Sequence, residues 1–231
     1  MKIMMITTSI RPTPTNFPPI GSLSIISYLQ RNDFDDVEFH HIDGNRPNFD
    51  DAVRHIIDRQ PDVLGISSVV STAYDYTKRI AQAVKAALPQ TLIVVGGNLA
   101  ASAEVLLRYA SVDLCVIGDG EKCFLDVVRR AEETHVPTEF SDIPGLAYLD
   151  DSQFRTTGFV NALDRSEIYE IDWDILDNAT DMDTYFTEVA PGSLGWNKFM
   201  HDPRAHEPGR IGKKFALIPA AKGCVARLRT H

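Results

Sequence analysis

The sequence has few cysteines, no long apolar stretch and no strong compositional bias. Three cysteines among 231 residues are too few, and odd in number, for a disulfide framework, so a reducing cytoplasmic location is expected. No apolar run approaches the roughly 20 residues that span a bilayer, and the start MKIMMITTSIRP has no signal-peptide pattern. With 44% hydrophobic and 24% charged residues, the composition is that of a globular protein and excludes collagen-like and low-complexity classes.

Charge is distributed unevenly along the chain. Residues 1–130 are nearly neutral, residues 131–190 carry 15 acidic and 2 basic side chains, and residues 191–231 carry 8 basic and 2 acidic ones. These blocks indicate one compact domain, an acidic connector and the start of a further domain. Nucleic acid is not an expected partner, because the basic end is short and has no aromatic platform pattern. A membrane is not expected either, because no apolar run is long enough to span one.

The first 135 residues alternate short apolar runs with segments of helical period, which predicts five βα units. Because the strands are continuous apolar runs, both faces of the sheet must be covered. We therefore expect an α/β fold with a doubly wound, parallel, five-stranded sheet of the flavodoxin-like kind, in the order 2-1-3-4-5. The expected strands are Lys2–Thr7, Val37–Ile42, Val63–Ser67, Thr91–Val95 and Asp113–Ile117, and the expected helices Gly21–Arg31, Phe49–Asp58, Ala73–Leu88, Ala100–Tyr109 and Glu121–Thr134.

Beyond His135 the alternation stops. Ile143–Leu149 and Gln153–Gly158 predict a small hairpin, and Phe215–Pro219 is a short apolar run that fits a strand. The expected organisation is a cofactor-binding domain over 1–136, a connector over 137–214 and a remnant of a further domain over 215–231.

Small residues follow the predicted strands at the edge where an open parallel sheet binds ligands. Glycines there let a bulky ligand lie against the backbone, whereas few acids, bases or histidines are present for acid–base chemistry. Taken singly, these residues also fit tight turns, helix caps and acidic helix starts; their shared placement favours a binding site. The candidates are Thr7, Thr8, Ser9, Ser67, Ser68, Gly96, Gly97, Asn98, Gly118, Asp119, Gly120 and Glu121.

Other nucleotide-binding motifs are missing. The first strand is followed by TTSIRP, without the glycines of a dinucleotide-binding fingerprint, and no P-loop is present. A receiver domain would need acidic residues at the end of the first strand, and Met5–Thr8 has none.

Four motifs on successive βα units carry a family resemblance. PPIGSLSIISYLQ, LGISSVVST, VVGGNLA and CVIGDGE together resemble the N-terminal cobalamin-binding domain of cobalamin-dependent radical SAM enzymes. DIPGLAY and the acidic stretch around Trp173 resemble the connector that follows it, so the likeness covers roughly residues 1–180. It implies cobalamin as cofactor, bound at the carboxyl ends of the strands, and adds Gly21 to the binding residues.

The resemblance also implies how cobalt is held. Cobalamin proteins that supply an imidazole to cobalt carry Asp-x-His-x-x-Gly after the first strand, and TTSIRPTP contains no histidine. His40 and His41 do not fit that spacing and are interpreted as strand-end or surface residues. We therefore expect base-off cobalamin without a protein histidine ligand, as in the methyl-transferring members of the family.

The chain departs from the family where the radical SAM domain would begin. The family holds a 4Fe–4S cluster on three cysteines, and the fourth iron binds S-adenosylmethionine. Here Cys224 occupies the first ligand position, but Leu228 and His231 stand at the second and third. Cys224 is thus a vestigial ligand of an incomplete site, because cluster irons need thiolates.

Two origins are consistent with this departure: a truncated or frameshifted form of a longer enzyme, or a separate cobalamin-binding module. In both, the cluster and S-adenosylmethionine belong to a full-length parent or to a separate radical SAM domain as partner, and this chain alone is inactive. The alternative function is a flavin- or nucleotide-binding flavodoxin-like domain without cobalt, since fold alone does not fix function. Cys115 and Cys123 are expected to be buried structural residues.

Overall fold

The computed structural model describes the chain except for residues 10–16, 160–162, 165–170, 189–208, 210–213 and 216–231. Its internal contacts divide the chain into two units, residues 1–15 with 19–180 and residues 16–18 with 181–231. The described part of the second unit holds a short helix, η5 (Met182–Tyr185), and the antiparallel pair β8 (Thr187–Glu188) and β9 (Lys214–Phe215). Most of the expected strand Phe215–Pro219, and Cys224, lie outside the described residues.

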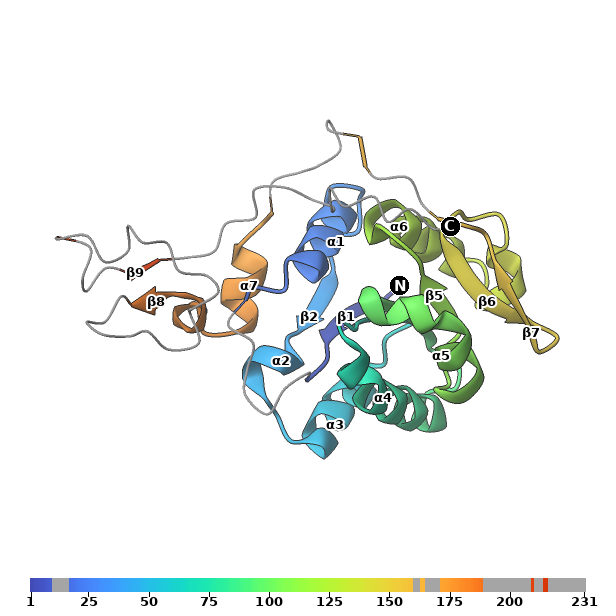
Figure 1. Cartoon of the computed structure of the whole chain (residues 1–231), viewed down its shortest axis with the longest axis horizontal. Helices are drawn as coiled ribbons and strands as arrows, with labels where there is room; N and C mark the ends of the chain where they lie inside the picture. The colour runs from blue at the N-terminus through green and yellow to red at the C-terminus, as the bar shows by residue number, and fades with distance from the viewer. Residues whose placement is uncertain (10–16, 160–162, 165–170, 189–208, 210–213, 216–231) are drawn as a thin grey trace, which may run out of the picture. The chain divides into compact units, whose positions relative to one another are not determined.

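The first unit contains the five predicted βα units (Figure 1). Its parallel strands are β1 (Ile3–Thr7), β2 (Val37–His40), β3 (Val63–Ser67), β4 (Leu92–Gly96) and β5 (Leu114–Val116). The helices that follow them are α1 (Ile20–Gln30), α2 (Ile42–Asn45) with α3 (Phe49–Arg59), η1 (Ser71–Ala73) with α4 (Tyr74–Ala87), η2 (Asn98–Ser102) with α5 (Ala103–Tyr109), and α6 (Gly120–Ala131).

The order of the sheet is β2-β1-β3-β4-β5-β6-β7, which confirms the predicted order of the five parallel strands. The predicted total of five is wrong, because the hairpin β6 (Leu146–Asp150) and β7 (Gln153–Thr156) joins the sheet instead of standing apart. β6 pairs antiparallel with β5 through Cys115 and Ala147, and Ile117 donates its backbone N–H to Gly145 O at 2.7 Å. The buried residues Leu146 and Ala147 explain this pairing, since a free hairpin would expose them.

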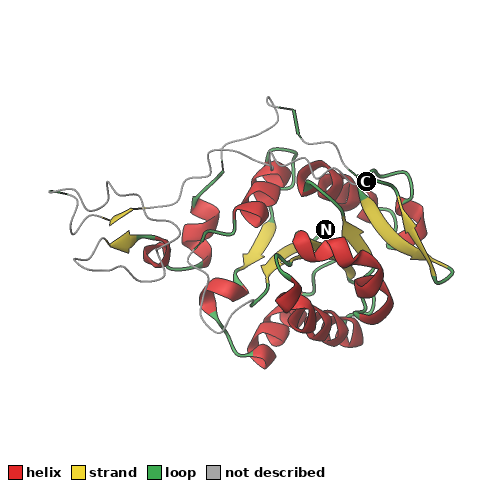
Figure 2. Cartoon of the chain, in the orientation of Figure 1, coloured by secondary structure: helices red, strands yellow, loops and turns green. Residues whose placement is uncertain are grey.

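Helices cover both faces of the sheet, as its apolar strands require (Figure 2). α1 and α6 pack on one face, where Ile26, Leu29 and Val127 are fully buried. α3, α4 and α5 pack on the other, where Ile56, Ile80, Val84 and Leu106 are fully buried. The helix starts and the carboxyl ends of the parallel strands therefore share one edge of the sheet, where the predicted site lies.

Candidate functional site

The ends of β1, β3 and β4 are aligned residue by residue. Thr7 pairs with Ser67, and Ser67 pairs with Gly96, so the last residues of three neighbouring strands form one row. β5 extends the row, because Val95 pairs with Cys115 and the Gly118–Glu121 turn follows. The fold thus brings the loops predicted from the sequence to one edge, which we call the strand-end rim (residues 7–9, 67–68, 96–98 and 118–121).

The loops after β3 and β4 touch through their backbones. Ser68 donates its N–H to Gly96 O at 3.0 Å, and Leu99 donates its N–H to Ser68 O at 3.0 Å. Gly97 has φ +85°, and a Cβ at this position would lie 2.5 Å from Ser68 O. Only glycine fits such a crossing, because a side chain would meet both an unfavourable φ and a backbone oxygen.

Beside this crossing the rim is open. Among the described residues, and apart from its own chain neighbours, no heavy atom lies within 4 Å of a Cβ placed on Gly96, and the same holds for Gly21 at the start of α1. A group that approaches Gly96 therefore meets backbone rather than side chains. This arrangement fits a large flat or elongated cofactor, which can lie close to the chain only where no side chain projects.

The predicted site residues divide by exposure into those a ligand could reach and those that support the rim. Four of them are exposed, namely Gly21, Gly97, Asn98 and Gly118. Five are half-buried, namely Ser9, Ser67, Gly96, Asp119 and Gly120. Thr7, Thr8, Ser68 and Glu121 are buried. Because Ser68 Oγ already lies 2.7 Å from Thr77 Oγ1, its hydroxyl holds α4 against the rim.

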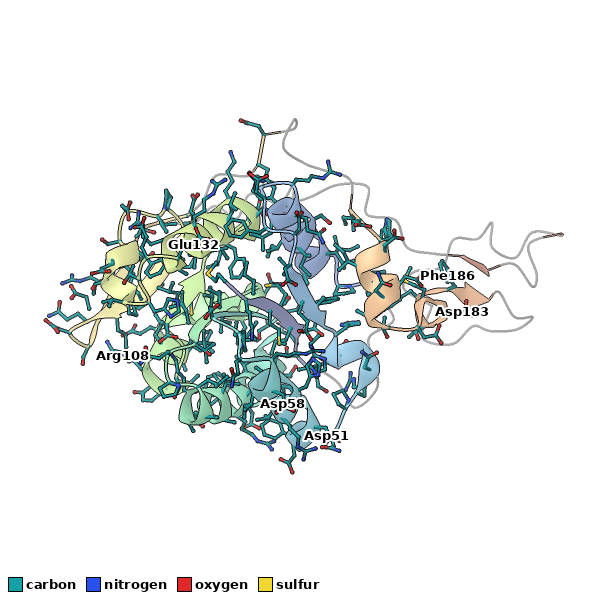
Figure 3. All side chains as sticks on the ribbon, turned by 180° about the vertical axis from the view of Figure 1, so that it is seen from behind. Asp51, Asp58, Arg108, Glu132, Asp183 and Phe186 are labelled. Carbon is teal, nitrogen blue, oxygen red and sulfur yellow. The ribbon has the colours of Figure 1, made fainter. Side chains whose placement is uncertain are left out.

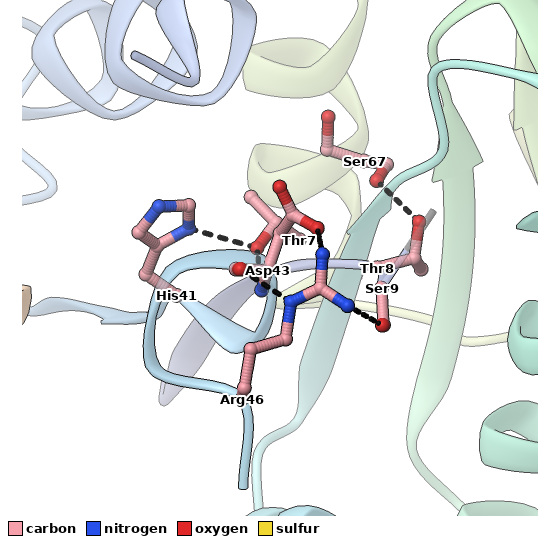
Figure 4. A network of polar contacts seen from close by, with 7 residues as sticks. All are labelled: Thr7, Thr8, Ser9, His41, Asp43, Arg46 and Ser67. Carbon is pink, nitrogen blue, oxygen red and sulfur yellow. Dashed lines mark hydrogen bonds and ion pairs between the residues drawn. The ribbon is translucent and has the colours of Figure 1, made fainter. Parts of the chain in front are cut away.

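Each hydroxyl of the first loop has a protein partner (Figure 4). Thr7 Oγ1 lies 2.9 Å from Nδ1 of His41 and accepts the backbone N–H of Asp43 at 3.0 Å. Thr8 Oγ1 donates to Ser67 O at 3.3 Å, which ties the ends of β1 and β3 together. Ser9 Oγ accepts a hydrogen bond from Arg46. Thr7, Thr8 and Ser9 were predicted to bind cofactor, and the geometry adds that their hydroxyls hold the loop in place.

Arg46 connects α2 to the same loop. Its Nε donates to Asp43 O at 2.7 Å, and its two terminal nitrogens bond Asp43 Oδ1 at 2.6 Å and Ser9 Oγ at 2.5 Å. The side chain is one-fifth exposed, so these contacts are partly shielded from water. The sequence analysis missed Asp43 and Arg46. The available signal was their place in the segment HIDGNRP, which directly follows a strand that ends at the same edge of the sheet.

Burial lowers the pKa of two neighbouring histidines, His40 at the end of β2 and His41 directly after it. Burial lowers the pKa of His41 to about 4, and the nearby Asp43 opposes that shift only in part. Burial also lowers the pKa of His40 to about 4, helped by the charge of His55, whose ring stacks on it at 4.3 Å. Both imidazoles are neutral at pH 7, and His41 is 2% exposed with Nδ1 bonded to Thr7.

Glu121 at the start of α6 is 2% exposed. Ser24 of α1 donates a hydrogen bond to its Oε1 at 2.6 Å. A buried carboxylate needs such partners, since desolvation is costly. Ser24, which the sequence did not single out, therefore joins the two helices on one face of the sheet beside the rim.

Within the described ranges, no group of three His, Cys, Asp or Glu side chains is arranged to hold a metal ion. Cys115 and Cys123 are free and buried, as expected from the sequence, and burial raises the pKa of each thiol to about 12. No helix in the part of the chain that the structure describes has the length and apolar character to cross a membrane.

Comparison with known proteins identifies a family and several relatives. Residues 8–128, just over half of the chain, match the family described as "B12 binding domain". The chain is 20% identical over 213 residues to an anaerobic magnesium-protoporphyrin IX monomethyl ester cyclase of Cereibacter sphaeroides, covering 90% of this chain and 30% of the relative. It is 29% identical over 168 residues to an uncharacterized methyltransferase of Pyrococcus horikoshii, covering 67% of this chain and 35% of the relative. The chain thus spans about a third of the length of these relatives.

Two solved structures share the fold. OxsB, a cobalamin-dependent S-adenosylmethionine radical enzyme with aqua-cobalamin and S-adenosylmethionine bound, matches with a TM-score of 0.64 at 18% identity, over 77% of this chain and 25% of that one. The radical S-adenosylmethionine methyltransferase TsrM from Kitasatospora setae, with cobalamin and a [4Fe-4S] cluster bound, matches with a TM-score of 0.59 at 15% identity, over 81% of this chain and 32% of that one. The predicted α/β flavodoxin-like fold class is confirmed.

Proposed function

Because the chain belongs to the B12-binding domain family, we propose that it is a cobalamin-binding module whose cofactor lies on the strand-end rim. The predicted resemblance to cobalamin-dependent radical SAM enzymes, and the cofactor it implied, are confirmed at the level of family and fold. The proposed binding domain covers residues 1–136. The proposed binding residues are Thr7, Thr8, Ser9, Gly21, Ser67, Ser68, Gly96, Gly97, Asn98, Gly118, Asp119, Gly120 and Glu121.

One observation carries this proposal: the open backbone at Gly96 beside the tight crossing of Ser68 and Gly97. The crossing fixes the third and fourth loops relative to each other, and the space at Gly96 leaves room for a bulky group. Cobalamin supplies a cobalt centre that can carry a methyl group, and this chain's contribution is to hold and orient the molecule. Backbone N–H groups, the half-buried Ser67 hydroxyl and the exposed Asn98 amide are donors that can serve its polar edge.

We also propose that cobalt receives no histidine from the described rim. Among the described residues, the imidazole that bonds the first loop is that of His41, which is buried and bonded through Nδ1 to Thr7. To reach a cofactor it would have to break that bond and leave a buried site, which is costly. The expected state is therefore base-off cobalamin without a protein imidazole.

The module is proposed to serve a radical SAM reaction, methyl transfer in particular, with the iron–sulfur chemistry supplied by a separate radical SAM domain. Cys224 is the single cysteine after Cys123, and a cluster of this type needs three thiolates. Anaerobic reconstitution of the chain with iron and sulfide is expected to retain no 4Fe–4S cluster. Retention of about four irons per chain, with the matching absorption, would contradict this part of the proposal.

Titration with hydroxocobalamin tests the binding function. A saturable change of the visible spectrum at micromolar protein is expected, whereas flavin mononucleotide is expected to give none. After reduction to cob(II)alamin, electron paramagnetic resonance lines without nitrogen splitting would support base-off binding without histidine. Saturable flavin binding with no response to cobalamin would favour a flavin-binding domain instead.

A further inference from the structure

The connector helix α7 (Asp174–Ala179) ends against the short helix α2. Asn45, the last residue of α2, donates from Nδ2 to Ala179 O at 2.7 Å. The Oγ1 of Thr180 lies 3.2 Å from where a Cβ on Gly44 would stand. The carboxyl end of α7 and the carboxyl end of α2 are therefore in contact, although 134 residues separate Asn45 from Ala179.

At its other side α2 holds the first loop of the rim. The buried Asp43 reaches Thr7 through its backbone N–H, and Arg46 reaches Ser9 through its guanidinium. His41, which precedes α2, bonds Thr7 as well. A displacement of α2 must therefore displace or break its bonds to Thr7 and Ser9.

The α2 turn is also stiff. Arg46 has φ +49°, a conformation that non-glycine residues keep only when neighbouring contacts impose it. Three hydrogen bonds to Asp43 and Ser9 impose it here. Gly44 packs closely on the His41 ring, where an added Cβ would lie 2.4 Å from Cδ2. A stiff element passes a displacement on instead of absorbing it.

We propose that α2 transmits the position of the connector helix α7 to the loop Thr7–Ser9, with Asn45 and Arg46 as its positioning residues. The inference rests on the proposed function, because it treats that loop as part of the cobalamin site. Movement of the connector, for instance when a further domain engages it, then changes the affinity of the rim for cobalamin. The connector is in this sense a regulatory element of the binding module.

The decisive variant is Asn45→Asp in the full chain, which keeps the size of the side chain but removes the donor to Ala179 O. We expect the backbone amide resonances of Thr7–Ser9 to shift in nuclear magnetic resonance spectra without cofactor. We expect the dissociation constant for hydroxocobalamin to rise about two- to tenfold, the effect of one lost hydrogen bond. Asn45→Ala should act in the same direction, which separates loss of the donor from the added charge.

Arg54→Ala is the matched control, since Arg54 forms an exposed ion pair with Asp51 on α3 and, among the described residues, no hydrogen bond or ion pair with α2. It should leave both readouts as in the wild type. If Asn45→Asp shifts the resonances of Ala179 and Thr180 but leaves those of Thr7–Ser9 and the affinity unchanged, the transmission is overturned. If the wild type binds no cobalamin, the proposed function fails, while the resonances of the loop still decide whether α2 transmits.

Discussion

Ser24 on α1 donates a 2.6 Å hydrogen bond to Oε1 of the buried Glu121 on α6, joining positions 97 residues apart. The two helices follow the first and the fifth parallel strands and pack on the same face of the sheet. Gly120 fits the same contact, because a Cβ there would lie 2.9 Å from Cδ1 of Ile25. This contact holds the start of α6, which belongs to the rim, against α1.

Ser24→Ala is expected to lower the free energy of unfolding by about 1–3 kcal/mol, because Glu121 stays buried and loses a charge-assisted partner. Urea denaturation followed by circular dichroism measures the change. Ser141→Ala, at an exposed position, should alter the midpoint little. Equal effects of the two substitutions would show that the bond contributes no net stability.

Gly97→Ala and Gly96→Ala should differ sharply although the residues are neighbours. Gly97 has φ +85° and faces Ser68 O, so an added methyl should lower the free energy of unfolding by about 1–3 kcal/mol from backbone strain alone. Gly96 faces open space, and alanine there should stay within about 1 kcal/mol of the wild type. Thermal unfolding of both variants distinguishes them, and an equal loss would contradict the described crossing of the two loops.

The elements and their order could be predicted because each depends on a local pattern. Buried parallel strands give continuous apolar runs, helices give a 3.6-residue period, and the βα alternation restricts the topology. The same logic placed Ser67, Gly96 and Gly118 at one edge. The addition of the hairpin to the sheet escaped prediction, since the pairing of Cys115 with Ala147 joins segments whose own patterns do not name a partner.

The polar partners of the rim could not be predicted for the same reason. The bond of Arg46 to Ser9 depends on a left-handed backbone conformation, and the bond of Ser24 to Glu121 on how two helices pack. Neither is encoded in spacing along the chain. The expected strand Val37–Ile42 also ran past its true end at His40, which hid the short helix α2.

Stability should fall as the pH is lowered from about 6.5 towards 5. The pKa of His40 and that of His41 are lowered from 6.5 to about 4 in the folded chain, so the unfolded chain binds protons first. The stabilisation is complete above pH 6.5 and is lost as the pH falls towards 4. Each pH unit in this range costs about 1.4 kcal/mol for the buried His41. The cost is smaller for His40, because its partly exposed ring is screened by water. Urea midpoints at pH 8, 6.5 and 5 measure it.

A His40→Gln/His41→Gln double variant provides the control for this pH dependence. It should be less stable at pH 8, because the bond of His41 to Thr7 is lost. Its midpoint should then change less between pH 8 and pH 5 than that of the wild type. An unchanged slope would assign the effect to other groups.

Cys115 and Cys123 should resist alkylation in the folded chain. Burial raises the pKa of both thiols to about 12, so almost no reactive thiolate forms at pH 8. Treatment with iodoacetamide followed by peptide mass spectrometry should find both unmodified, and modification should appear in parallel with unfolding in urea. Rapid labelling of either residue in buffer would show that its strand or helix opens locally.

Gly96→Trp should weaken cobalamin binding at least tenfold while the fold is kept. The indole can occupy the space at the end of β4, where a Cβ meets no heavy atom of the described residues within 4 Å beyond its chain neighbours. It would then cover the backbone that the cofactor is proposed to contact. Gly97→Trp is less informative, because the substitution strains the backbone against Ser68 O whether or not a ligand binds there. The matched control is Asp58→Trp, which adds the same side chain at an exposed position on α3 (Figure 3).

Titration with hydroxocobalamin should show at least a tenfold rise in the dissociation constant for Gly96→Trp, equivalent to about 1.4 kcal/mol, and no change for Asp58→Trp. Circular dichroism and the unfolding midpoint should match the wild type for both variants. If Gly96→Trp binds as tightly as the wild type, cobalamin does not lie against the end of β4. The rim would then have to hold the cofactor through the first or the fifth loop. Gly21→Trp would distinguish these two loops, because Gly21 is exposed and faces open space at the start of α1, directly after the first loop. Loss of binding in this variant would indicate the first loop.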